Sequence, residues 1–321
     1  MLNVFVPGPN GLVRSAPADG APVPQNALWL DLYQPTVEEE QHVEHSLGIE
    51  VPSREEMREI ESSNRLYEEN GALYMTATLV TQLDTDVAGV RTQVTFILTG
   101  AYLVTNRYAD PLPFKRFIAF AETHPAACSS AATLLAGLLE AIVNRIADVL
   151  EKIGSDIETL SGTVFTHRRR PHDFRHELEE IGQGGELVSK ARESLVSLQR
   201  LLGFLQQSTN EKLTVEARAT LHTVSRDVDA LSSHASFLGE KVQFLLDATL
   251  GMLTIDQNNI LKIFSIVAVV LLPPGIIASF YGMNFEYIPL LHQRWGVWAS
   301  IVMMLASAWL PWIYFRRKGW L

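Results

Sequence analysis

The chain has 321 residues, of which 47% are hydrophobic and 19% are charged, and its formal net charge is −10. The length allows more than one domain. The acidic balance argues against a nucleic-acid-binding protein, because such a protein needs a basic face. Cys128 is the single cysteine of the sequence, which excludes an internal disulfide and favours a reducing compartment for the soluble part. The sequence shows no side-chain pattern typical of a catalytic site, so we do not expect an enzyme.

Residues 1–125 predict a mixed α/β domain. Short apolar runs indicate strands, and amphipathic runs indicate helices. The expected strands are Asn3–Val6, Leu28–Leu32, Leu73–Val80, Val94–Leu98 and Tyr102–Thr105, and the expected helices are Thr36–Leu47, Ser53–Ile60 and Pro113–Glu122. Thr36 is typical of a helix N-cap, and the glutamates that follow it are favourable in the first turn.

Residues 126–212 predict antiparallel helices, and residues 213–262 predict the stalk part of one long helix. Apolar side chains along the stalk recur in steps of three and four, which is typical of a heptad seam. The seam consists of Val224, Val228, Leu231, Ala235, Leu238, Val242, Leu245, Thr249 and Met252. A helix from Thr214 to Tyr281 would be about 100 Å long. Because one compact domain cannot contain such a helix, we expect it to pack against other helices, foremost those of further copies of the chain.

The C-terminal part contains two long apolar runs, residues 263–281 and 296–315. A helix needs about 20 apolar residues to cross the hydrocarbon core of a bilayer, so both runs predict transmembrane helices. Lys262 precedes the first run, and the basic tail at 316–321 follows the second. Because basic residues favour the cytoplasmic side, we expect both termini in the cytoplasm and the loop at 282–295 outside.

The connecting loop begins with Gly282, Met283 and Asn284. We expect Gly282 to end the first span in the left-handed conformation that glycine adopts without strain. The helix C-terminus is the negative end of the helix dipole, and Asn284 adds an amide oxygen there. Because Mg²⁺ gives up water reluctantly, a neutral amide that hydrogen-bonds the water shell suits a hydrated ion. These groups predict the outer mouth of an ion pathway shared by several copies.

Two segments, "YGMNFEYIP" after the first span and "YFRRKGWL" at the end of the chain, closely resemble the CorA family of magnesium and cobalt transporters. The resemblance implies an α+β cytoplasmic domain of the α/β/α sandwich type, a long stalk helix and two C-terminal transmembrane helices, assembled as a pentameric funnel. It implies influx of hydrated divalent cations across the inner membrane, with Mg²⁺ foremost and Co²⁺ or Ni²⁺ as further candidates. The implied partners are the bilayer, the cations and other copies of the chain. No cofactor is expected, and cytoplasmic Mg²⁺ is expected to act as a regulatory ligand that gates the channel.

The resemblance also assigns roles to individual residues. Gly282, Met283 and Asn284 become the selectivity filter, and Glu286 the acidic residue of the loop. The implied pore-lining residues are Asn258, Leu261, Phe264, Ser265, Ala268, Leu272, Gly275 and Ser279. The regulatory carboxylates would be Asp84, Asp86, Asp227 and Asp229. The chain departs from the family pattern at Gly275, where many members have threonine, and at Leu290, where members often have an acidic residue.

Two alternative functions fit the same pattern. One is zinc transport by a ZntB-type protein, a type related to the CorA family. ZntB-type proteins typically carry Gly-Val-Asn, whereas this chain has Met283 between Gly282 and Asn284. A membrane-anchored coiled-coil sensor or scaffold without a pore would also need two spans and a stalk. That second alternative leaves the segment from Gly282 to Asn284 without a role.

Overall fold

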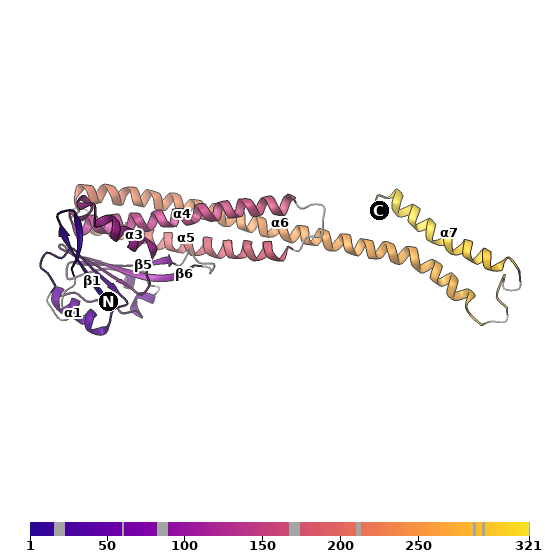
Figure 1. Ribbon diagram of the computed structural model, residues 1–321, viewed down its shortest axis with the longest axis horizontal. Coiled ribbons are helices and arrows are strands. Elements are labelled where there is room, and N and C mark those ends of the chain that lie inside the picture. The colour runs from indigo at the N-terminus through magenta and orange to yellow at the C-terminus, as the bar shows by residue number, and fades with distance from the viewer. Residues whose placement is uncertain are drawn as a thin grey trace. The chain divides into compact units, whose positions relative to one another are not determined.

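The computed structural model describes residues 1–15, 23–59, 61–81, 89–166, 174–209, 213–284, 287–290 and 293–320 (Figure 1). These residues form two compact units. One comprises the described parts of Met1–Arg168 and Arg175–Leu246, and the other is built on Asp247–Leu321. The longest helix, α6 (Val215–Tyr281), contributes residues to both units. The predicted helix from Thr214 to Tyr281 is thereby confirmed.

A seven-stranded sheet in the order β2-β1-β3-β7-β6-β5-β4 forms the centre of the first unit. The strands are β1 (Leu2–Gly8), β2 (Gly11–Ser15), β3 (Trp29–Tyr33), β4 (Leu66–Glu69), β5 (Ala72–Thr81), β6 (Val90–Leu98) and β7 (Leu103–Arg107). The central pair β3–β7 is parallel, with Trp29 opposite Leu103. The other neighbouring pairs are antiparallel. Each of the five predicted strands is present, although their ends differ by a few residues from those predicted.

Helices cover both faces of this sheet. On one face, Val43 of α1 (Val37–Leu47) packs into a core with Val4, Leu30 and Ile97. The other face packs against α3 (Leu112–Ala121), α4 (Ala131–Thr166), α5 (Arg175–Thr209) and the N-terminal part of α6. This arrangement confirms the α/β/α sandwich.

The start of α1 agrees with its sequence signal. Thr36 Oγ1 accepts a hydrogen bond from the Glu39 backbone at 3.3 Å, and the Glu39 carboxylate accepts one from the Thr36 backbone at 2.9 Å. This is a capping box, which satisfies two backbone donors that a helix start leaves open. At the other end Gly48 has φ +65°, which only glycine adopts readily.

Most of the heptad seam of α6 is buried, with Leu231, Val242 and Met252 half-buried, but its partners differ from those expected. Leu238 and Val242 pack against α4 and α5 of the same chain, in the core that covers the sheet. Gly185 of α5 allows this approach, because a Cβ there would lie 3.0 Å from Val242 Cγ1. The expectation that copies of the chain cover this part of the seam is therefore wrong. The helices α4 and α5 precede it and supply the apolar faces that it needs.

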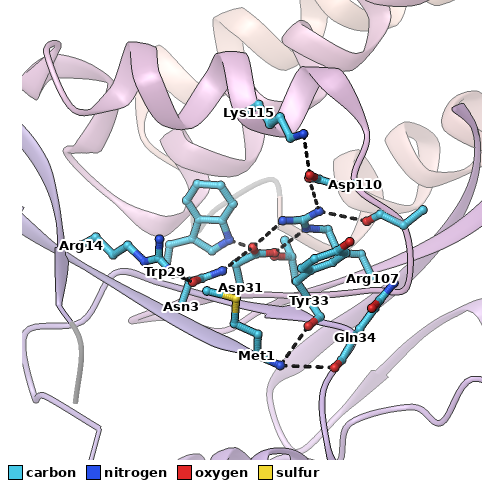
Figure 2. Close-up of polar contacts among 12 residues, drawn as sticks. Met1, Asn3, Arg14, Trp29, Asp31, Tyr33, Gln34, Arg107, Asp110 and Lys115 are labelled. Carbon is cyan, nitrogen blue, oxygen red and sulfur yellow. Dashed lines mark hydrogen bonds and ion pairs between the residues drawn. The ribbon is translucent and has the colours of Figure 1, made fainter. Parts of the chain in front are cut away.

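A buried ion pair joins the two parallel strands at the centre of the sheet (Figure 2). Arg107 of β7 donates from Nε and Nη2 to the carboxylate oxygens of Asp31 on β3, at 2.9 Å each. Thr105 Oγ1 donates to the same carboxylate at 2.8 Å. Burial lowers the pKa of Arg107, but the hydrogen bonds and charges of Asp31 and Asp110 outweigh burial and raise it. The pair therefore holds β3 against β7.

The same arginine connects the sheet to α3. Its Nη1 donates to Asp110 at 2.8 Å, and Asp110 also accepts from Lys115 of α3 at 2.7 Å. The guanidinium lies over the rings of Tyr33 and Phe114, at 4.6 and 4.8 Å from their centroids. With these contacts the side chain is enclosed and serves the fold rather than a ligand.

The sequence prediction fails at three places in the sheet domain. The strands β2 and β4 were not predicted, although the Asn70-Gly71 turn between β4 and β5 is a strong hairpin signal, with φ of +51° and +77°. The helix predicted over Ser53–Ile60 is a single 3₁₀ turn, Glu56–Arg58. Ser53 and Glu56 bond each other locally, and Met57 alone is buried in that turn, so no apolar stripe supports a longer helix. Ile60 itself lies outside the described residues.

Candidate functional site

The second unit contains two helices that are long and apolar enough to cross a membrane. They are the C-terminal part of α6 and α7 (Gly296–Arg317), and both present mostly exposed apolar side chains. Pro273 and Pro274 lie inside α6, which continues through them to Tyr281. Proline removes backbone donors, so the carbonyls of Val269 and Val270 lose their usual helical partner. Such a break is tolerated in a membrane where neighbouring groups or water satisfy these carbonyls.

One stripe of α6 carries all the residues that the resemblance implies as pore-lining, and all of them are exposed. These residues are Asn258, Leu261, Phe264, Ser265, Ala268, Leu272, Gly275 and Ser279. The Ser265 hydroxyl donates back to the Leu261 carbonyl at 2.8 Å, so it is turned toward its own helix. The stripe is therefore mainly apolar, with Asn258 and Ser279 as its polar positions near the two ends.

A second stripe of α6 is more buried. Ile266 is 6% exposed, and the half-buried positions in line with it are Lys262, Val270, Pro273, Ile277 and Tyr281. At about 3.6 residues per turn, the two stripes lie on opposite sides of the helix. Lys262 lies over the Trp320 ring at 5.6 Å, so the buried stripe faces the chain segment that follows α7. The exposed stripe thus points away from this contact with Trp320.

The end of α6 differs from the expected cap. Gly282 does not have a positive φ, so the predicted left-handed conformation is wrong. Instead, the Gly282 N–H continues the helical pattern to the Ala278 carbonyl at 3.0 Å, and Met283 N–H bonds the Phe280 carbonyl at 3.4 Å. The helix therefore ends through a tightened last turn, which needs no left-handed residue. A Cβ on Gly282 would lie 3.2 Å from the Ala278 carbonyl oxygen, so the position is nevertheless tight.

The three residues expected to form the filter follow directly at this helix end. Gly282 and Asn284 are exposed, and Met283 is 50% exposed. They stand where the last carbonyls of α6 lack helical donors, so the surroundings favour cations. Glu286 lies outside the described residues.

The loop returns to α7 through a close backbone contact that the sequence analysis missed. Leu290 has φ +74°, and its carbonyl accepts from Gln293 N–H at 3.3 Å. Gly296, the first residue of α7, is buried against this carbonyl, and a Cβ there would lie 2.0 Å from the oxygen. Ile288 is also buried, at 7% exposure. The position of Gly296 just before an apolar run was the signal in the sequence that could have indicated this close contact.

The end of α7 is fixed by a Schellman motif. Gly319 has φ +69°, its N–H bonds the Arg316 carbonyl at 3.2 Å, and the Trp320 N–H bonds the Phe315 carbonyl at 3.1 Å. The Trp320 ring stacks on Phe315 with centroids 5.6 Å apart. Lys318 Nζ lies over the same tryptophan ring, at 5.1 Å from its centroid. The motif therefore places Lys318 of the basic tail at the same tryptophan ring as Lys262.

The carboxylates expected to sense Mg²⁺ are only partly described. Asp84 and Asp86 lie outside the described residues. Asp227 and Asp229 are exposed on α6, but residues two apart on a helix point to different sides. Asp229 Oδ1 accepts from Gln199 Nε2 at 2.7 Å. Across the described ranges, no group of three or more His, Cys, Asp or Glu side chains is placed to hold a metal ion.

The fold and this unit define a class of protein: a sheet domain followed by a long helix whose C-terminal part is the first of two apolar spans, with α7 as the second. Residues 24–317 match the family described as CorA-like Mg²⁺ transporter protein. The chain belongs to this family, and we therefore describe it as a membrane protein.

Individual relatives match the chain over most or all of its length. The chain is 34% identical over 322 residues to the magnesium transport protein CorA of Haemophilus influenzae, covering 100% of both sequences. It is similar in structure to the complete CorA magnesium transporter of Methanocaldococcus jannaschii, with a TM-score of 0.80, 20% identity, and coverage of 100% of this chain and 99% of that one. The ZntB cytoplasmic domain of Vibrio parahaemolyticus matches with a TM-score of 0.59 and 11% identity, over 78% of this chain and 96% of that one.

Proposed function

We propose that the protein is a channel-type transporter for hydrated divalent cations, foremost Mg²⁺, and that it carries them across the inner membrane into the cytoplasm. Its membership of the CorA-like Mg²⁺ transporter family supports this choice of ion. Co²⁺ and Ni²⁺ are further candidates, because they are divalent cations that also carry a firmly held water shell.

The observation that carries the proposal is the exposed stripe of α6 from Asn258 to Ser279, which lies opposite the buried stripe and is followed, just beyond the helix end, by the exposed Asn284. One stripe of one helix cannot enclose water, so the pathway requires several copies of the chain around a common axis. The number five comes from the family resemblance. Leu261, Phe264 and Leu272 are exposed apolar residues of this stripe, and in such an assembly they would form constrictions that gate by dewetting.

The outer end of the proposed pathway suits an ion that keeps its water. Mg²⁺ dehydrates reluctantly and is bound through its water shell where the site is neutral. Asn284 offers an amide oxygen and an amide N–H₂ but no charge. A ring of such groups beside the C-terminal carbonyls of α6 attracts a cation without stripping it.

The orientation and the regulation belong to the same proposal. Lys262 and the basic residues that close α7 lie at one end of the two spans, which favours that end as the cytoplasmic one. Both termini would then be cytoplasmic. We further propose that cytoplasmic Mg²⁺, bound by carboxylates such as Asp227 between neighbouring copies, holds the channel closed.

The proposed function is tested by replacing Asn284 with alanine. The substitution removes the amide that meets the hydrated ion but leaves the backbone of an exposed loop residue unchanged. We expect Mg²⁺ uptake into liposomes that contain the purified Asn284→Ala protein to fall to the level of protein-free liposomes. The uptake is followed with a Mg²⁺-sensitive dye enclosed in the liposomes.

Asn144→Ala is the matched control, because Asn144 is an exposed asparagine on α4 in the other unit. It should transport at the wild-type rate. Size-exclusion chromatography of all three proteins establishes that the assembly is intact. Wild-type uptake by an intact Asn284→Ala assembly would refute the role of the amide in the pathway.

Zinc transport is the second candidate, favoured by the structural similarity of 78% of this chain to the ZntB cytoplasmic domain. Met283 argues against it, because the zinc-transporting relatives typically carry valine at this position. We expect hexamminecobalt(III), a mimic of hydrated Mg²⁺ that cannot lose its ligands, to block uptake at the outer ring. Strong competition by Zn²⁺ together with no block by the hexammine complex would favour the zinc transporter.

A further inference from the structure

A cavity of about 440 Å³ lies at one edge of the sheet, far in sequence from the membrane spans. The edge strand β4 begins at Leu66, which pairs with Met75, whereas β5 continues beyond this pair to Thr81. Helix α5 lies beside this free edge of β5, where Ser197 Oγ accepts a hydrogen bond from the Thr78 N–H at 2.9 Å. The cavity opens between β4, β5 and α5, entirely within the first unit.

The walls of this cavity are unusually basic for a protein with a net charge of −10. Arg65, Arg192 and Arg200 line it, together with one acidic residue, Glu193. The Glu193 carboxylate is already paired with Arg91 Nη1 at 2.8 Å. Within the described part of the chain, neither Arg192 nor Arg200 has an ion-pair partner. The cavity therefore carries a net positive charge that the fold does not neutralise.

Arg65 is held in place by the protein itself. Its Nε donates to the Glu59 carbonyl, and its Nη1 donates to Thr78 Oγ1 at 3.2 Å. Because a guanidinium has five N–H donors, others remain available. Burial lowers the pKa of Arg65, Glu193 opposes this effect, and the nearby charge of Arg200 adds to it. Two cationic side chains thus lie close enough to repel each other, and an anion between them would relieve that repulsion.

We propose that this cavity binds the phosphate groups of an organic phosphate ester of nucleotide size. Arginine forks match phosphate oxygens in geometry and charge, and they bind phosphate more strongly than neutral donors do. The volume of the cavity falls in the range of about 300–1,000 Å³ that is typical of small-molecule sites. A lone phosphate ion would leave most of this volume empty. Leu66 and Val196 provide apolar wall for the organic part. This site is separate from the proposed ion pathway and does not depend on it.

The test measures binding of ATP to the full-length protein in detergent by isothermal titration calorimetry. EDTA is present throughout, so that no divalent cation occupies other sites. We expect ATP to bind, pyrophosphate to compete with it, and adenosine not to bind. Arg192→Gln and Arg200→Gln should each weaken ATP binding at least tenfold, because each removes a charged fork from the cavity. Their melting temperatures without ligand should equal that of the wild type, because neither arginine is used in an ion pair of the described fold.

Arg226→Gln is the matched control, since Arg226 is exposed on α6 outside the cavity. It should bind ATP with the wild-type affinity. The proposal is overturned if ATP does not bind at millimolar concentration, or if Arg192→Gln and Arg200→Gln bind it as tightly as the control. Binding of adenosine with the affinity of ATP would also overturn it, because the phosphates would then not be recognised. These outcomes are independent of any transport assay.

Discussion

At the level of single residues, the loop between the two spans depends on Gly296. The Leu290 carbonyl occupies the space that a side chain at Gly296 would need, since a Cβ there would lie 2.0 Å from the carbonyl oxygen. Leu290 itself has φ +74°, a conformation that a residue with a side chain adopts only at a cost in free energy. The loop therefore combines a leucine in an unfavourable backbone conformation with a glycine position that has no space for a side chain.

We expect Gly296→Ala to destabilise the protein by about 1–3 kcal/mol, as overpacking with a backbone shift does. The displaced Leu290 would move the loop that carries Asn284, so uptake should fall as well. The stability is measured as the temperature at which the detergent-solubilised assembly is lost in size-exclusion chromatography. Gly203→Ala is the control, because a Cβ at Gly203 of α5 meets nothing within 4 Å. A Gly296→Ala protein as stable as this control would contradict the close contact.

The glycines also show what a sequence can indicate at this scale. Gly48 ends its helix in the left-handed conformation, as a helix-terminal glycine suggests, but Gly282 does not. The two look alike in sequence, and the difference arises from the path of the chain after the helix. The roles of Gly296 and Gly319 depend on a carbonyl approaching in the fold and on the register of a Schellman motif. The three residues that we expect to form the filter were predicted from their place after an apolar run and from the family resemblance, and their role stays a prediction.

At the level of elements, the parallel strands β3 and β7 depend on one buried ion pair. The Arg107 side chain is 5% exposed and that of Asp31 is 0% exposed. Removing one partner leaves the other charge without compensation in the interior. We expect Arg107→Met to lower the free energy of unfolding by about 3–5 kcal/mol. The double variant Asp31→Asn with Arg107→Met should recover part of this loss, because the neutral amide can still accept from Thr105.

Thermal unfolding of the full-length protein, followed by circular dichroism, measures these changes. Arg91→Met is the matched control, because the Arg91–Glu193 pair is exposed to solvent. The Arg91 side chain is 54% exposed and that of Glu193 is 48% exposed. Such a pair contributes at most about 1 kcal/mol. If Arg107→Met is no more destabilising than Arg91→Met, the buried pair does not hold the two strands together.

The long secondary-structure elements were predicted from the sequence more completely than the short ones. The long helices repeat an apolar pattern over many turns, so α4, α5, α6 and α7 could be recognised from the sequence. Short edge strands such as β2 and β4 lack such a pattern and were not predicted, although the Asn70-Gly71 turn was a signal that could have indicated β4. The arginine cavity could not be predicted, because Arg65 and Arg200 are brought together only by the packing of α5 on the sheet edge.

At the level of the whole molecule, α6 serves two different kinds of packing. Its N-terminal part is covered by α4 and α5 of the same chain, which leaves that part of the seam without need of another copy. In its membrane part, the stripe that contains Ile266 is buried, and the opposite stripe from Asn258 to Ser279 is exposed. The proposed pathway requires that copies of the chain meet along this exposed membrane stripe.

Cysteine cross-linking tests this assembly with little background, because Cys128 is the single cysteine of the sequence and is buried. In a Cys128→Ala protein, Leu272→Cys introduces a thiol on the exposed stripe, and Ile266→Cys introduces one on the buried stripe. A disulfide requires Cβ atoms about 3.5–4.5 Å apart. If the copies surround a narrow shared axis, their residues 272 would come this close, so we expect mild oxidation in membranes to give covalent dimers of Leu272→Cys.

Ile266→Cys is the matched comparison, because its side chain lies on the buried stripe and is 6% exposed in the single chain. It should remain monomeric on a non-reducing gel after the same oxidation. A thiol reagent that carries positive charge should also block Mg²⁺ uptake by Leu272→Cys, since it would enter the same passage as the ion. Dimers from Ile266→Cys alone would place the buried stripe between the copies and turn the exposed stripe toward lipid, which would contradict a pathway along Asn258 to Asn284.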